Sequence, residues 1–141
     1  MITNYFTHRT NPTLSEEIVI PDWLLNITDR KICNFVICNV YTQGSTIFDL
    51  YQIDKFESNT EENRNYLLKN TNLPSGATLL LNIEDIPNIN DITKYTYIEV
   101  DTNINTTATL DINVSYTSPD PSSIPNTPIG PNYDPAFPSE G

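Results

Sequence analysis

The sequence contains few of the residues on which catalysis, phosphate binding and nucleic-acid binding usually depend. Its single histidine, His8, offers little to a hydrolase or a zinc site, because both chemistries draw on histidine. Four glycines leave little room for a phosphate-binding loop, and no glycine-rich nucleotide motif occurs. Seven Lys and Arg against eighteen Asp and Glu give a net charge of −11, which disfavours nucleic acid and anionic membranes as partners. The sequence therefore predicts a protein that is not an enzyme and holds no cofactor or metal ion.

Long apolar runs are also missing, and the opening MITNYFTHRT has neither an apolar core nor a basic start. A membrane-spanning helix and a secretory signal are therefore not expected. The two cysteines, Cys33 and Cys38, stand five positions apart in one predicted strand, where their side chains would point to opposite faces. We expect free thiols rather than a disulfide, which fits a reducing compartment.

Polar and apolar residues alternate along several short stretches, and this alternation predicts β-strands. The clearest stretch is 107–116, whose apolar row, expected to face a core, consists of Ala108, Leu110, Ile112, Val114 and Tyr116. Further strands are predicted over 32–41, 46–53, 66–68, 78–81 and 95–101, and the first two are expected to form a hairpin. No long helical period occurs. The predicted fold is all-β, with residues 31–117 forming an antiparallel Ig-like or jelly-roll-like β-sandwich.

The two ends of the chain differ from this central pattern. Residues 1–30 include two prolines and no sustained period, so they are predicted to form an irregular N-terminal arm with one possible helical turn. Residues 118–141 include seven prolines, which remove amide donors and favour extended backbone, so they are predicted to form a tail. Such a segment takes its order from a neighbouring surface. The predicted partner contacts in the two ends are Tyr5, Phe6, Trp23, Ile129, Tyr133 and Phe137.

Acidic residues form several short groups that deserve comparison with known sites. Neighbouring carboxylates at 16–17, 61–62 and 84–85 are predicted to lie in solvated loops, since glycosidase carboxylates face each other across a cleft. Asp101-Thr-Asn103-Ile-Asn105 resembles the first half of a calcium loop, but Thr106 replaces the glycine expected at its sixth position. This stretch is predicted to be a turn between strands, and a weak calcium site of another type stays open.

Three segments together resemble small β-sandwich virion proteins of tailed bacteriophages. They are NFVICNVYTQGSTIFDLYQID, YLLKNTNLPSGATLLL and YTYIEVDTNINTTATLDINVSYT, which cover about the middle two-thirds of the chain. The resemblance lies in the order of strands and turns, and it includes neither the opening residues nor the proline-rich tail.

The resemblance implies a non-enzymatic virion protein present in many copies, such as a capsid decoration or cement protein or a neck or tail accessory subunit. Its implied partners are other virion subunits: the major capsid protein, portal or neck proteins, or tail proteins. The alternative from a different class is a carbohydrate-binding module, in which Tyr41, Tyr51, Tyr95 and Tyr97 would form a platform for sugar rings. Tyrosines also pair across neighbouring strands, and we expect that pairing here.

Overall fold

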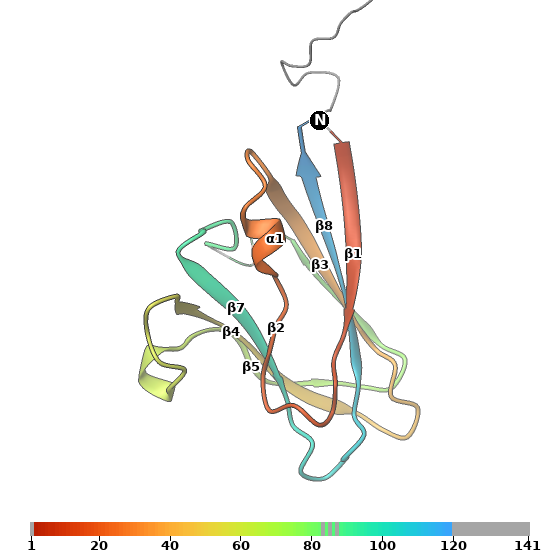
Figure 1. Cartoon of the computed structure of the whole chain (residues 1–141). Coiled ribbons are helices and arrows are strands. Elements are labelled where there is room, and N and C mark those ends of the chain that lie inside the picture. Colours follow the sequence, from red (N-terminus) through yellow and green to blue (C-terminus); the bar gives the residue numbers. More distant parts are fainter. Residues whose placement is uncertain (1, 83, 85, 87, 120–141) are drawn as a thin grey trace, which may run out of the picture.

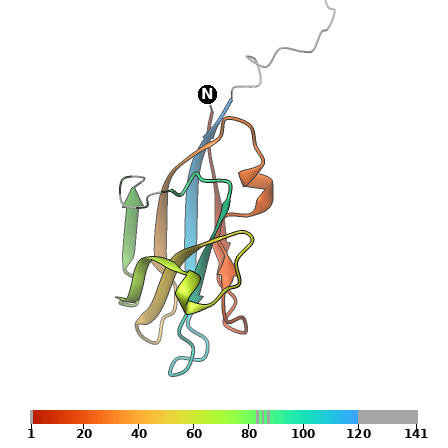
Figure 2. The same cartoon turned by 90° about the vertical axis from the view of Figure 1, so that its left-hand side faces the viewer.

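A computed structural model describes residues 2–82, 84, 86 and 88–119. These residues form two four-stranded antiparallel sheets packed face to face, which confirms the predicted all-β sandwich (Figures 1 and 2). Sheet A has the order β1-β8-β3-β6, formed by β1 (Ile2–Arg9), β8 (Leu110–Ser118), β3 (Lys31–Asn39) and β6 (Thr78–Asn82). Sheet B has the order β2-β7-β4-β5, formed by β2 (Glu17–Ile18), β7 (Lys94–Val100), β4 (Thr46–Asp54) and β5 (Asn65–Leu73). Two short helices, α1 (Asp22–Leu25) and η1 (Glu61–Asn63), lie in connections between strands.

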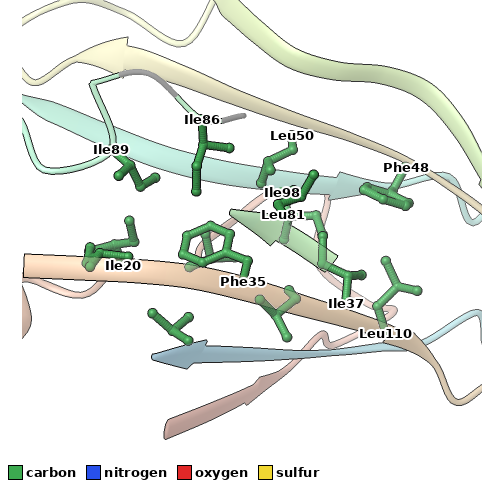
Figure 3. Close-up of a cluster of buried hydrophobic side chains, with 14 of the residues drawn as sticks. Ile20, Phe35, Ile37, Phe48, Leu50, Leu81, Ile86, Ile89, Ile98 and Leu110 are labelled. Atoms are coloured by element: carbon green, nitrogen blue, oxygen red, sulfur yellow. The ribbon is translucent and has the colours of Figure 1, made fainter. Parts of the chain in front are cut away.

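The core lies between the two sheets and is built from alternating apolar positions (Figure 3). In and just before β8, the predicted inward row is confirmed: Ala108, Leu110, Ile112 and Val114 are buried, and Tyr116 is half-buried. Strands of both sheets supply the facing side chains, among them Phe35, Ile37, Phe48, Leu50 and Ile98. Ile86 and Ile89, which lie in the connection between β6 and β7, are buried in the same cluster. Period-two alternation therefore places one row of each strand in a shared apolar layer.

The predicted hairpin of the segments 32–41 and 46–53 is wrong. Both segments are strands, but β3 lies in sheet A and β4 lies in sheet B, so the connection crosses from one layer to the other. Buried Asn39 stabilises this crossing: its Nδ2 donates to the carbonyl oxygens of Gly44 and Leu73, and its Oδ1 accepts from Thr46 Oγ1 and the Tyr41 N–H. Because side-chain hydrogen bonds hold the turn, the strands need not pair with each other.

The predicted irregular arm over 1–30 is wrong for residues 2–9. These residues form β1, which pairs with β8 along its whole length from Ile2↔Ser118 to Arg9↔Asp111. The inward row of β1 contains the polar side chains of Asn4 and His8, so the apolar alternation that usually marks a strand is interrupted. The following residues, 10–30, contain the two-residue strand β2 and the one-turn helix α1.

Cys33 and Cys38 are free thiols, as predicted, and both are half-buried. Strict alternation of faces does not apply between these two cysteines, because the register of β3 against β8 shifts between Ile32 and Asn34. Ile32 and Phe35 are accordingly both buried, although an odd spacing of three positions would place them on opposite faces of a regular strand. Among the described residues, no helix is long and apolar enough to cross a membrane.

Candidate functional site

Three aromatic side chains from separate parts of the sequence meet at one side of the sandwich. Phe6 of β1, Trp23 of α1 and Tyr116 of β8 form an aromatic triad with ring centroids 5.3, 6.2 and 6.3 Å apart. All three pairs are edge-to-face, the geometry that aromatic quadrupoles favour. Trp23 nevertheless leaves 53% of its surface exposed, so the triad presents a large apolar side chain to the outside.

Helix α1 holds Trp23 in this position through its buried neighbours. Leu24 is 0% exposed and Leu25 is almost fully buried, and both belong to the core cluster. The amides of Leu24 and Leu25 donate to the Pro21 carbonyl oxygen, which closes the single turn. Two leucines therefore fix the helix to the core and leave the preceding residue at the surface.

The structure brings together two of the predicted contact residues and separates a third. Phe6 and Trp23 belong to the aromatic triad, whereas Tyr5 points to the opposite face of β1 and is 73% exposed. The remaining predicted contacts, Ile129, Tyr133 and Phe137, lie outside the described residues. Tyr116 completes the triad, although sequence reasoning assigned it only to the core row. Its alternation placed it on the correct face, but nothing in the sequence placed Trp23 beside it.

The triad lies close to the point where the proline-rich segment begins. Ser118, the last residue of β8, pairs with Ile2 at the start of β1, and Tyr116 stands two positions before it (Figure 1). Pro119 and Pro121 follow directly in the sequence. An exposed tryptophan and the beginning of the predicted tail are therefore at the same end of the sandwich.

A second aromatic group lies on the outer face of sheet B. Tyr51 is opposite Tyr97 on one neighbouring strand and Tyr66 on the other, with both ring centroids 5.6 Å away. The Tyr51 ring is 0% exposed because the Arg64 guanidinium covers it, with its carbon 4.4 Å from the ring centroid. Burial raises the pKa of Tyr51 and of Tyr97 above the ordinary value of a phenol. Cross-strand tyrosine pairing is thus confirmed for this pair.

A polar shell fixes the groups around Tyr51. Arg64 donates to Asn59 Oδ1 at 2.9 Å and to Glu99 Oε1 at 3.1 Å, and Asn59 Nδ2 donates to the Tyr51 hydroxyl at 3.0 Å. The Tyr66 hydroxyl donates to Glu61 Oε1 at 2.9 Å. The hydroxyls of Tyr51 and Tyr66 and the ring of Tyr51 are engaged in contacts within the chain, which is the arrangement of a packed outer cluster.

A hollow of about 310 Å³ beside β4, β5 and β7 is lined mainly by polar and acidic residues. Each of its carboxylates already has a partner in the chain. Asp49 accepts the Asn70 N–H at 2.7 Å, Asp101 accepts the Asn103 N–H at 2.9 Å, and Glu99 pairs with Arg64. The stretch that resembles half a calcium loop is therefore a turn closed by its own side chains. The residues that the structure describes contain no group of three or more His, Cys, Asp or Glu arranged to hold a metal ion.

The single histidine joins the two sheets. His8 Nε2 of β1 lies 2.9 Å from Glu17 Oε1 of β2, and the other oxygen of Glu17 accepts the Asn11 N–H. This contact links an edge strand of sheet A to an edge strand of sheet B. Its place in the fold is structural.

Comparisons with protein-family models and with curated proteins gave no match. Among solved structures, the coat protein of Tobacco streak virus is similar, with 10% sequence identity over 91% of this chain and 90% of that chain, and a TM-score of 0.41. A superposition this loose does not define a function, so function is inferred from the residues of this chain.

Proposed function

We propose that the chain is a non-enzymatic structural subunit of a virus particle, present in many copies. Its form is a capsid decoration or cement protein, or a neck or tail accessory subunit, of the type found in tailed bacteriophages. The β-sandwich acts as a rigid body, and the proline-rich residues 118–141, together with the exposed aromatic side chains near the N-terminus, dock it on other virion subunits.

The observation that supports this proposal most is the position of the aromatic triad. Trp23 exposes half of its surface immediately beside the end of β8, where the proline-rich residues begin. Half-exposed tryptophans are favoured anchors at protein interfaces, because they bury a large area at low entropic cost. Beyond this point, Ile129, Tyr133 and Phe137 are spaced along a segment without Lys or Arg, and these apolar side chains are the proposed contacts of the tail.

The test is a copy-number measurement on virus particles that carry the gene for this chain. Quantitative mass spectrometry of purified particles should find it in a fixed ratio to the major capsid protein, with many copies in a decoration role and few in a neck role. A protein that stays with the host-cell fraction and is absent from purified particles would contradict the proposal. Particles washed at high salt serve as the control for loosely adsorbed protein.

The carbohydrate-binding alternative depends on tyrosine rings that are open to a ligand. Tyr51 is fully buried under Arg64, and Tyr95 and Tyr97 pack edge-to-face with centroids 6.2 Å apart. Tyr51 therefore offers no ring face to a sugar, and one face of Tyr97 lies against Tyr51, which favours the structural role over sugar stacking. A glycan array with the full chain distinguishes the two, since a carbohydrate-binding module should retain a defined group of glycans.

A further inference from the structure

Strand β1 is an edge strand of sheet A with one side free of strand partners. It pairs with β8 through all eight residues, and the structure assigns it no second strand among the described residues. The Thr10 N–H, just after β1, donates to the Leu110 carbonyl oxygen at 2.9 Å. The even-numbered residues of β1 therefore direct their main-chain groups toward β8, because these groups alternate in direction along an antiparallel strand. The N–H and C=O groups of Thr3, Tyr5, Thr7 and Arg9 consequently point away from the sheet.

The other edges of the sandwich are shorter or irregular. β6 has five residues and β2 has two, which leaves little edge to extend. β5 has nine residues, but its register against β4 shifts twice, it contains Lys69, and Asn70 adopts a φ of 51°. These features are the usual protections against edge-to-edge pairing. β1 has a regular register and contains neither Lys nor Pro.

The exposed side chains along β1 carry almost no net charge in a chain whose net charge is −11. Thr3, Tyr5 and Thr7 are neutral and exposed. Arg9 at the end of the strand is already paired, since it donates to both Asp111 oxygens at 2.6 and 2.8 Å. A second β1 strand can therefore approach this edge without placing like charges opposite each other.

We propose that β1 pairs antiparallel with β1 of a second copy about a twofold axis that passes near Tyr5. Tyr5 would lie opposite Tyr5 of the second copy, and Thr3 opposite Thr7, so that all outward main-chain groups of these residues find partners. An axis perpendicular to the sheet keeps both cores on the same side and joins the two A sheets into one continuous sheet. In this register, odd-numbered residues of one copy lie opposite odd-numbered residues of the other. Their outward main-chain groups can then form the paired hydrogen bonds of an antiparallel ladder.

A second copy fits this edge better than the proline-rich segment of the same chain. Residues 118–141 include seven prolines, each lacking an amide donor, so that segment is poorly suited to form a new hydrogen-bonded strand. The β1 sequence, in contrast, is complementary to itself about Tyr5. This inference assigns Tyr5 to self-association and leaves Phe6 and Trp23 for other subunits, and the isolated protein is sufficient to test it.

Pairing through one edge buries a small area, so the dimer should be weak in dilute solution and strengthened where many copies are held together. Sedimentation of the full chain from about 10 μM to about 1 mM should show the mass rising from 16.0 kDa toward twice that value. A constant monomer mass across this range would overturn the proposal.

Variants at one pair of neighbouring positions separate edge pairing from other contacts. Tyr5→Pro removes an outward amide donor that β8 does not use, and Tyr5→Lys places two like charges together at the axis. Each should weaken dimerisation by about tenfold or more, because the proline variant loses two symmetric hydrogen bonds and the lysine variant sets two like charges against each other. The matched control is Ser115→Lys, which adds the same charge to the position beside Tyr5 on β8 but not at the edge. Equal weakening by Ser115→Lys would show association through the face of the sheet and overturn the proposal.

Hydrogen exchange provides a readout that does not depend on a variant. The amides of Thr3, Tyr5 and Thr7 should exchange fast at low concentration and become protected as the dimer forms. The amides of Asn4, Phe6 and His8, directed toward β8, should be protected at every concentration. If the mass doubles while the outward amides stay unprotected, the copies associate elsewhere and the edge pairing is wrong.

Discussion

Asn39 at the end of β3 donates a hydrogen bond to the carbonyl oxygen of Leu73 at the end of β5, with Nδ2 and O 2.8 Å apart. The two residues belong to different sheets, so one buried amide fastens the layers together. The main chain completes the connection, because the Gly76 amide donates to the Asn39 carbonyl oxygen at 3.0 Å. Two of the connections that cross between the layers, β3 to β4 and β5 to β6, thus meet at Asn39.

Replacing Asn39 by Ala should lower the free energy of unfolding by about 2–4 kcal/mol, because buried donors and acceptors lose their partners. The measurement is urea denaturation followed by circular dichroism. Thr46→Val serves as the control, since it removes one hydrogen bond of the same network and should cost about 1 kcal/mol. Equal effects of the two variants would show that Asn39 is not the centre of this network.

Replacing Trp23 by Ala should cost about 2 kcal/mol, roughly half the loss for a buried tryptophan, because half of the side chain is already exposed. Leu24→Ala, at a fully buried neighbouring position, should cost about 2–5 kcal/mol. Chemical denaturation of both variants under one set of conditions provides the comparison. A larger loss for Trp23 than for Leu24 would contradict the assignment of Trp23 as a half-exposed side chain.

The ion pair between Arg9 and Asp111 should make stability depend on pH in the acid range. The hydrogen bonds from Arg9 hold the pKa of the Asp111 carboxyl below its ordinary value. An acid whose native pKa is lowered contributes stability above its unfolded pKa, and this contribution disappears as the pH falls through the native pKa.

The variant Asp111→Asn should accordingly melt below the wild type at pH 7, and the difference should shrink as the pH falls below the ordinary carboxyl range. Calorimetry at a series of pH values gives the two melting temperatures. Asp101→Asn is a control at an exposed carboxylate without a cationic partner in the described contacts. A difference that stays constant into acid would show that the ion pair is not its cause.

Much of the fold is predictable from local patterns. The alternation from Ala108 to Tyr116 gave the correct buried face, because a central strand with one core face repeats every two residues. The turn at 74–77 was also predictable, since Gly76 adopts a φ of +75° that glycine tolerates best.

The partner of each strand was less accessible to sequence reasoning. A turn between β3 and β4 looks the same in sequence whether the chain returns within one sheet or crosses to the other. The hydrogen bond that spans the layers here joins Asn39 to Leu73, which is distant in the sequence. Strand β1 was missed because its inward row includes Asn4 and His8, whose polar groups find partners in Ser118 and Glu17. The aromatic triad depends on the pairing of β1 with β8 and on the packing of α1 against the core.

We propose that the residues after β8 attach this sandwich to a virus particle. A decisive measurement compares particle incorporation of the full chain with that of a chain ending at residue 119, which retains all the strands that the structure describes. Both are produced in cells that make particles lacking the native copy, and the chain is quantified in purified particles. We expect the shortened chain to fold, as circular dichroism would show, but to be largely lost from particles. Incorporation of the folded, shortened chain at the level of the full chain would contradict it.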